Sequence, residues 1–363
     1  MTAPTVGSTI PEGRAATSPP EERGLSRDDV KLLVASPGRV THTTFRYLGE
    51  HLAPGDVVVV NTSATRPAAI DGTWRNGAVV VHFSNRLPTG RWAVELRRVD
   101  GNGPVLDAAE DDGIDLVGGA SVSLEAPVSQ RDDGVRLWQA KVVSRGPLES
   151  HLARHGRPIT YGHTDRRWPL AAYQSVFARP DDPSGASAEM PSAGRPFTTS
   201  LVASLVSAGV VVVPVTLHAG VSSPERNEPP PAEPYRVPSA TAEAVNAARR
   251  RGNRVVAVGT TVTRALESAA DPDGTVQAEE GWTELVLSAE RPTRVVNGLV
   301  TGWHTPEASH LLLLEAVAGA DLVSQAYRAA ADAGYLWHEF GDSCLLLPVS
   351  PPAAYHTRRF LWI

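Results

Sequence analysis

The sequence predicts an α/β main domain with a mixed, largely parallel sheet, into which a small antiparallel β-barrel domain is inserted. Beyond about residue 148, apolar strands alternate with amphipathic helices, and this order indicates parallel strands joined by helical crossovers. Between about residues 67 and 143, short segments alternate apolar and polar residues with almost no helical pattern, which is typical of a small barrel or sandwich. The 363 residues are long enough for two domains.

These patterns divide the chain into three parts. Residues 1–28 are rich in Pro, Ser, Thr and Glu, and we expect them to form a flexible N-terminal segment. We expect residues 29–66 and 148–363 to form the α/β main domain, and residues 67–147 to form the inserted β-barrel domain.

The first elements follow from short local patterns. KLLVAS (31–36) predicts a strand, THTTFRYLGEHL (41–52) a short helix that ends before Pro54-Gly55, and DVVVV (56–60) a fully buried strand. In the insertion, period-2 alternation predicts four strands, at GAVVVHF (77–83), RWAVELRRV (91–99), ASVSLEA (120–126) and VRLWQAKVV (135–143).

The later elements carry helix start and stop signals. Thr198 is the expected N-cap of a helix that ends at Gly209, and Thr305 the N-cap of a helix that runs to about residue 319. Further helices are expected at 239–253, 260–270 and 321–334, and strands at 210–217, 254–259 and 343–348.

Composition excludes several classes of protein. The net charge of −6 attracts neither nucleic acid nor an anionic membrane, so RNA would need a local basic patch, such as the one formed by Arg154, Arg157, Arg166 and Arg167. The chain has no apolar run of about 18 residues and no secretory signal, and its single cysteine lies in the apolar run SCLLLP. We therefore expect a cytoplasmic protein without a membrane partner.

Polar residues follow several of the expected strands. Ligands gather at these positions in open α/β sheets. The residues concerned, in chain order, are Asn61, His218, Gly220, Thr260, Thr261, Arg264, His304 and Thr305. The Gly-Thr-Thr helix start suits a carboxylate, a phosphate or a ribose hydroxyl. His218 fits a catalytic base, a ligand clamp or an ordinary structural histidine. No metal-ligand spacing and no dinucleotide or P-loop motif is present, so we predict no metal and no prosthetic group.

The order of several segments resembles the S-adenosylmethionine:tRNA ribosyltransferase-isomerase family of queuosine biosynthesis. The resemblance is carried by VTHTTFRYLGEHLAPGDVVVVNTS (40–63), AYQSVFARP (172–180), PSAGRPFT (191–198), GVVVVPVTLHAG (209–220), GNRVVAVGTTVTRALESAA (252–270), RVVNGLVTGWHTPEASHLLLLEAVAG (294–319) and AYRAAADAGYLWHEFGDSCLL (326–346). It implies an α/β domain with an inserted barrel. It also implies that S-adenosylmethionine is the co-substrate and donates its ribosyl unit to a 7-aminomethyl-7-deazaguanine in tRNA, releasing adenine and methionine and leaving an epoxycyclopentane.

The resemblance also implies a set of site residues. His218 is the candidate base, because a positioned base can remove a C5′ proton that the adjacent sulfonium has acidified. The expected substrate-binding residues are Asn61, Arg66, Tyr173, Gln174, Ser192, Gly194, Arg195, Phe197, Gly220, Thr260, Thr261, Arg264, His304 and Thr305.

Some family motifs are altered in this chain. The family's PTAGLHF is PSAGRPF here, with Pro196 in place of the histidine, and the segment before Tyr235 lacks the family's GTF element. Proline cannot titrate or form a side-chain hydrogen bond. Three interpretations follow: a divergent ribosyltransferase-isomerase acting on tRNA, a paralogue that binds S-adenosylmethionine or a related nucleoside but uses another acceptor, or an inactive binding protein.

Overall fold

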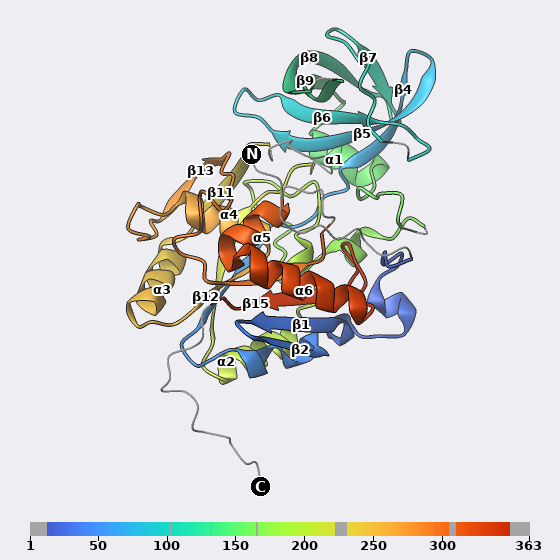
Figure 1. Ribbon diagram of the computed structural model, residues 1–363. Coiled ribbons are helices and arrows are strands. Elements are labelled where there is room, and N and C mark those ends of the chain that lie inside the picture. Colours follow the sequence, from blue (N-terminus) through green and yellow to red (C-terminus); the bar gives the residue numbers. More distant parts are fainter. Residues whose placement is uncertain are drawn as a thin grey trace.

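In the computed structural model, a nine-stranded mixed sheet forms the centre of the protein (Figure 1). The structure describes residues 13–101, 103–131, 133–164, 166–221, 231–304 and 310–348. The strand order is β13-β11-β10-β3-β12-β14-β15-β1-β2. The strands are β1 (Lys31–Ser36), β2 (Arg39–Thr44), β3 (Val57–Asn61), β10 (Val211–Leu217), β11 (Glu233–Val237), β12 (Val255–Val258), β13 (Glu279–Thr283), β14 (Gly298–Gly302) and β15 (Ser343–Leu346).

The middle of this sheet is parallel, as the alternation of helices and strands predicts. Strand β3 pairs in parallel with both β10 and β12, and β12 pairs in parallel with β14. Antiparallel pairs lie toward both edges, at β10/β11, β11/β13, β14/β15 and β1/β2. The carboxyl ends of β3, β10, β12 and β14 therefore share one edge of the sheet, where a ligand site is expected.

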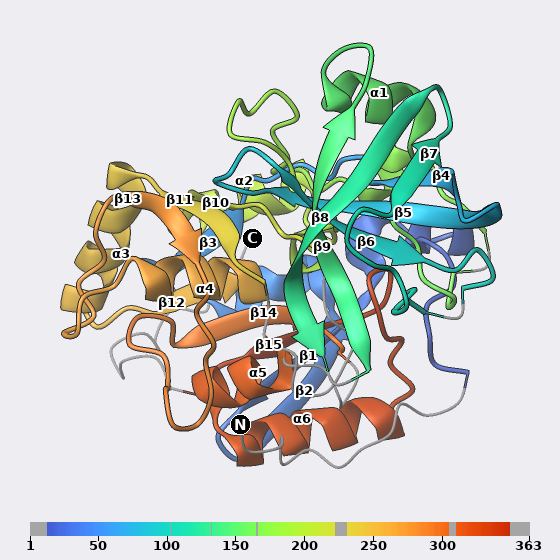
Figure 2. The same cartoon turned by 90° about the horizontal axis from the view of Figure 1, so that it is seen from above.

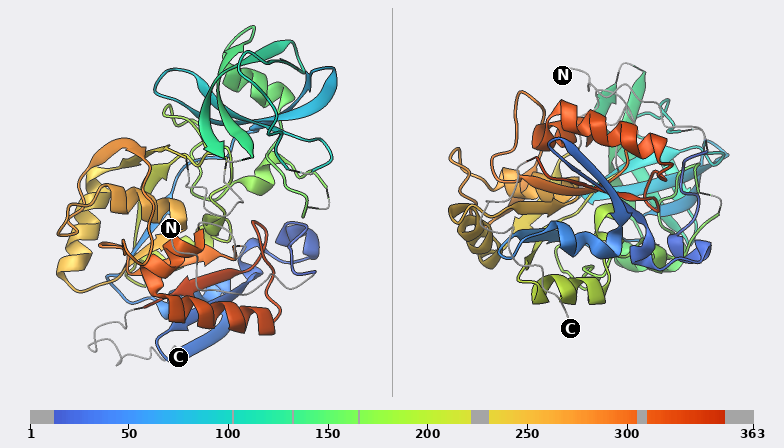
Figure 3. Two further views of the ribbon diagram at one scale, coloured as in Figure 1. Left: turned by 45° about the horizontal axis from the view of Figure 1, so that its top comes forward. Right: turned by 60° about the horizontal axis from the view of Figure 1, so that its bottom comes forward.

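Helices cover both faces of the sheet, and the right-hand view of Figure 3 shows α6 (red) and α2 (yellow-green) on opposite sides of it. Because successive strand residues point to opposite faces, Val57 and Val59 pack with one group of helices, whereas Val58 and Val60 pack with α2 and the 3₁₀ helix η3. The helices are α2 (Thr199–Ser207), α3 (Ser239–Arg250), α4 (Thr260–Ser268), α5 (His310–Ala318) and α6 (Ala320–Asp332), with the 3₁₀ helices η1 (Pro20–Arg23), η2 (Arg27–Asp29), η3 (Phe45–His51), η4 (Leu170–Tyr173) and η5 (Ser192–Gly194).

The inserted segment forms a closed antiparallel barrel, which stands above the large sheet in Figure 1 and in front of part of it in the view from above (Figure 2). Its strands are β4 (Ala69–Trp74), β5 (Gly77–Arg86), β6 (Trp92–Arg97), β7 (Gly113–Leu116), β8 (Ala120–Arg131) and β9 (Gly134–Val143), in the order β4-β5-β6-β9-β8-β7. Helix α1 (Leu148–His155) also packs on the barrel, because Leu148 and Leu152 belong to the barrel's apolar core. We therefore propose that the inserted unit extends beyond residue 147 to include α1.

One expectation needs correction, and another cannot be compared because its residues are not described. Residues 41–44, expected to be helical, form the end of β2 and pair with β1 (Lys31 with Thr44), and only the short 3₁₀ helix η3 follows. Threonine is β-branched and favours strands, which explains why T-H-T-T extends the hairpin. The expected helix at 303–319 is described from His310 onward, so its expected cap at Thr305 lies outside the described residues.

Residues 13–28, part of the segment expected to be flexible, pack against the main domain. Ala16 is buried, and the Trp337 backbone N–H donates to the Arg14 carbonyl at 2.9 Å. Glu21 accepts a hydrogen bond from the buried Arg195 guanidinium at 2.8 Å. Among the described residues, no helix is long and apolar enough to cross a membrane.

Candidate active site

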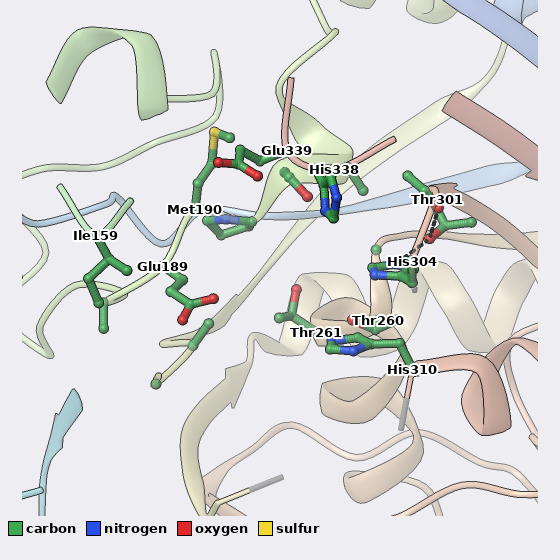
Figure 4. Close-up of a pocket in the computed structure, with 18 of the residues that line it drawn as sticks. Ile159, Glu189, Met190, Thr260, Thr261, Thr301, His304, His310, His338 and Glu339 are labelled. Carbon is green, nitrogen blue, oxygen red and sulfur yellow. Dashed lines mark hydrogen bonds between the residues drawn. The ribbon is translucent and has the colours of Figure 1, made fainter. Parts of the chain in front are cut away.

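A cavity of about 460 Å³ lies beyond the carboxyl ends of β12 and β14. Its wall combines the start of α4, the end of β14 with His304, the segment 188–193 before α2, residues 159–163, residues 338–339 and Arg97 of the barrel. Figure 4 shows Thr260, Thr261 and His310 on one side of this space, and Glu189, Met190, His338 and Glu339 on others. Its volume lies in the range of small-molecule sites.

The N-terminus of α4 opens onto the cavity. Gly259 has φ +94°, and a Cβ there would lie 3.2 Å from the Ala193 Cβ, so glycine allows α4 to begin close to η5. The Thr261 hydroxyl oxygen accepts a hydrogen bond from the Asn61 amide at 3.2 Å, which ties α4 to the end of β3. The first backbone N–H groups of a helix have no partner within it, so this wall suits a carboxylate.

Two stacked histidines form the adjoining wall. The His304 and His310 rings are parallel within 3°, with centroids 4.5 Å apart. His304 Nε2 and the Gly302 carbonyl each lie 3.1 Å from the Thr301 hydroxyl; when Thr301 donates to the carbonyl, Nε2 carries the proton and Nδ1 is the basic nitrogen. Burial, followed by the charges of His310 and His338, holds the pKa of His304 well below its usual range, so this imidazole is neutral at pH 7.

His310 offers an unused polar atom to the cavity. Its Nδ1 is buried and has no hydrogen-bond partner within the described parts of the chain. Burial lowers the pKa of His310 to about 4, so its ring is also neutral at pH 7. Since buried polar atoms normally have partners, this nitrogen is a natural contact for a bound ligand.

Tyr161 and Glu189 form a hydrogen-bonded pair on the side of the cavity nearest the barrel. Tyr161 donates its hydroxyl hydrogen bond to Glu189, and the Arg97 guanidinium lies 5.3 Å from the centre of the Tyr161 ring. Burial, and then the charge of Glu189, raise the pKa of Tyr161 well above its usual value, so Tyr161 remains a donor. The sequence offered no signal for this pair, because neither residue follows a strand.

A third group contains His163, His338 and Glu339. His163 Nε2 lies 2.7 Å from the Glu339 carboxylate, and the His163 and His338 rings stack with centroids 4.0 Å apart. Burial raises the pKa of Glu339, but the hydrogen bond and charge of His163, a backbone hydrogen bond and the charge of His338 together hold the pKa below its usual value. His163 and Glu339 are separated by 176 positions in the chain, so spacing in the sequence does not reveal this cluster.

The expected site residues divide between the cavity wall and its surroundings. The cavity is lined by Tyr173, Ser192, Gly220, Thr260, Thr261, Arg264 and His304. The residues that do not line it are Asn61, Arg66, Gln174, Gly194, Arg195, Phe197 and His218. Thr305 lies outside the described residues.

His218, expected to be the base, lies behind the wall with both ring nitrogens engaged. Nδ1 is 2.7 Å from the Ser63 hydroxyl and Nε2 is 2.9 Å from the Ser184 hydroxyl, which donates to Asp182 at 2.5 Å. Burial, and then the charge of Arg66, lower the pKa of His218 to about 4. These contacts join the end of β10 to the loop around Asp182, and the role of His218 as base stays a prediction.

Several other expected residues also hold the scaffold. The Gln174 side chain bonds both the N–H and the C=O of Thr65, at 3.0 and 2.7 Å. The Arg66 guanidinium donates to the Ser84 carbonyl at 2.7 Å, and Arg195 donates to the Ala172 carbonyl at 2.8 Å. Phe197 is a core residue with no exposed area.

Arg264 lines the cavity, but its guanidinium nitrogens already donate hydrogen bonds to protein groups. Its guanidinium pairs with buried Glu233 and donates to the carbonyls of Leu285 and Thr283, each at 3.1 Å. Glu233 in turn accepts from the Gly220 N–H at 2.8 Å. Arg264 therefore shapes the wall by joining α4, β11 and the segment after β13.

Comparisons with known proteins agree with one another. Residues 8–346 match the family model described as "Queuosine biosynthesis protein". Curated proteins named S-adenosylmethionine:tRNA ribosyltransferase-isomerase are 35% identical in Symbiobacterium thermophilum (93% of this chain and 97% of that protein) and 36% identical in Thermus thermophilus (91% and 97%). The crystal structure of an S-adenosylmethionine tRNA ribosyltransferase from Thermotoga maritima matches with a TM-score of 0.51 and 28% identity, over 94% of this chain and 99% of that one.

Proposed function

The chain belongs to the queuosine biosynthesis protein family, and we propose on this basis that it is an S-adenosylmethionine:tRNA ribosyltransferase-isomerase. The observation that carries the proposal is the match to enzymes of that name along nearly the whole chain. The enzyme acts in the cytoplasm, where tRNA is modified. It transfers and isomerises the ribosyl unit of S-adenosylmethionine onto a 7-aminomethyl-7-deazaguanine in tRNA, which gives epoxyqueuosine and releases adenine and methionine.

The cavity offers complementary groups for S-adenosylmethionine. The methionine carboxylate is directed to the backbone N–H groups at the start of α4, near Thr260 and Thr261. The adenine is directed to His310, whose buried Nδ1 has no partner within the described parts of the chain. A hydrogen bond to the purine stabilises adenine as it leaves, because negative charge develops on the ring as the glycosidic bond breaks.

His304 is the proposed base. Its neutral ring lines the cavity, and its proton on Nε2 is held by Thr301, so Nδ1 is available to accept a proton. The sulfonium acidifies the C5′ hydrogens of S-adenosylmethionine, so a weak but well-placed and desolvated base suffices. His304 also lies in the segment 294–319, which carries part of the resemblance to the family.

Glu189 is the proposed contact for the acceptor. The acceptor's aminomethyl group is a primary amine that is cationic at neutral pH, and the Glu189 carboxylate lies on the side of the cavity nearest the barrel, beside Tyr161 and Arg97. A charge-assisted hydrogen bond between them orients the amine toward the ribosyl unit.

Pro196, which stands in place of the family histidine, lies beside the segment that lines this cavity. Pro196 is buried and does not line the cavity, whereas Ser192 and Ala193 of the same segment do. The substitution is therefore compatible with the family reaction.

The test is a reaction of the purified full chain with S-adenosylmethionine, with and without tRNA that carries 7-aminomethyl-7-deazaguanine. Adenine release that depends on this tRNA, together with the epoxycyclopentane nucleoside detected by mass spectrometry, is the expected result. Binding of S-adenosylmethionine without any release on addition of the tRNA would contradict the proposal.

A further inference from the structure

The cluster of His163, His338 and Glu339 lies on the cavity wall but has no part in the reaction proposed above. One potential ligand atom from each of the three side chains lies within 4.8 Å of the other two. Within the parts of the chain that the structure describes, no other three His, Cys, Asp or Glu side chains meet this condition. The arrangement therefore differs from a chance pair of surface histidines.

Two imidazoles and one carboxylate are a recurrent ligand set for zinc, with a fourth position open to water or substrate. Zinc binds these atoms at about 2.0–2.2 Å, so ligand atoms around the ion lie roughly 3.3 Å apart. His163 and Glu339 are already in contact, at 2.7 Å. The widest separation is at most 4.8 Å, so it has to close by at most about 1.5 Å for all three atoms to reach one zinc ion.

The backbone holds His338 in an uncommon conformation. Its φ is +73°, in the left-handed region that few residues with a side chain adopt, although histidine, asparagine and aspartate are enriched there. The Gly341 N–H donates to the His338 carbonyl at 3.0 Å. The Asp342 carboxylate accepts from the N–H groups of Lys31 and Leu336, each at 2.8 Å. The turn is therefore anchored on both sides, and it places His338 beside His163.

We propose that His163, His338 and Glu339 bind one divalent transition-metal ion of the zinc type. All three residues line the cavity, so the open coordination position faces the molecule bound there. An ion at this place takes an oxygen or nitrogen atom of that molecule as its remaining ligand. The proposal stands independently of the reaction assigned above, because it depends only on the three side chains and the cavity.

The test is a zinc titration of the full chain, freed of metal and of any polyhistidine tag, by isothermal titration calorimetry. We expect one ion per chain with a Kd below about 10 µM. His163→Gln, Glu339→Gln and His338→Asn should each weaken binding at least about 100-fold. Asparagine is chosen at 338 because it tolerates the left-handed backbone, and circular dichroism checks that each variant is folded.

His155→Ala is the matched control. His155 belongs to another histidine pair, whose rings are tilted by 42° with the His151 centroid 4.8 Å away, and no third ligand completes that pair among the described residues. Its loss should leave zinc binding unchanged. Absence of binding to the original chain, or binding that survives all three variants at the cluster, would overturn the proposal. Binding that is lost instead in His304→Ala would also overturn it, because the ion would then lie at the other histidine pair.

Discussion

Removing the guanidinium of Arg264 should destabilise the protein strongly. Arg264 and Glu233 are each only 6% exposed, and Arg264 also donates to the carbonyls of Leu285 and Thr283. Arg264→Ala leaves a buried carboxylate without its cation, which costs about 3–5 kcal/mol. The two carbonyls lose charge-assisted hydrogen bonds worth about 1.5–3 kcal/mol each, but water in the adjoining cavity replaces much of this. We therefore expect a loss of about 3–5 kcal/mol in the free energy of unfolding.

The assay is urea denaturation followed by tryptophan fluorescence, with linear extrapolation to water. Arg91→Ala is the control, because Arg91 pairs with Glu125 at the exposed surface and should leave the free energy of unfolding unchanged within error. The double variant Arg264→Met with Glu233→Gln should be more stable than the sum of its single changes predicts, since neither charge is then left unpaired. A loss below about 1 kcal/mol for Arg264→Ala would refute the claim that this pair holds the wall together.

Three further predictions follow, two on the reaction and one on how the stability of the fold depends on pH. His304→Ala should slow tRNA-dependent adenine release at least about 100-fold if His304 is the base, whereas a surface control, His155→Ala, should not change it; equal rates would remove His304 from that role. Glu189→Gln should raise the KM for the modified tRNA about 10–100-fold and leave the KM for S-adenosylmethionine unchanged, and the opposite pattern would place Glu189 on the donor. His218, surrounded by the charges of Arg66, Asp182 and Arg236, has a pKa of about 4 when folded and 6.5 when unfolded, so the unfolded chain binds the extra proton. The free energy of unfolding should therefore fall as the pH drops from 6.5 toward 4, by up to about 1.4 kcal/mol per pH unit for this residue. His218→Asn should make urea midpoints less sensitive to pH between these values. An unchanged dependence of the midpoint on pH would count against the lowered pKa of His218.

Much of the fold could be predicted because its signals are local. Buried runs such as 255–258 and the alternating segments of the barrel identify strands, and the Thr198 side chain caps α2 as expected, by accepting from the Leu201 N–H. The error at residues 41–44 arose because that short segment pairs with β1, an interaction that apolar spacing does not report.

The site could be predicted only where a strand ends. Thr260, Thr261 and His304, predicted from strand ends, line the cavity because the carboxyl ends of parallel strands meet at one edge of a sheet. Glu189 and the cluster with His163 come from irregular segments that only the folded chain brings together. The role of His218 as base stays a prediction, and nothing in the sequence shows that Ser63 and Ser184 lie at its two ring nitrogens.

The central claim is the ribosyl transfer to tRNA, and the most direct measurement follows the products. The chain is incubated with S-adenosylmethionine and tRNA bearing 7-aminomethyl-7-deazaguanine, and adenine, methionine and the modified nucleoside are quantified by mass spectrometry. Equal amounts of adenine, methionine and epoxyqueuosine, formed only when the modified tRNA is present, are the predicted result. If S-adenosylmethionine binds but none of these products forms with this tRNA, the account of the acceptor is wrong.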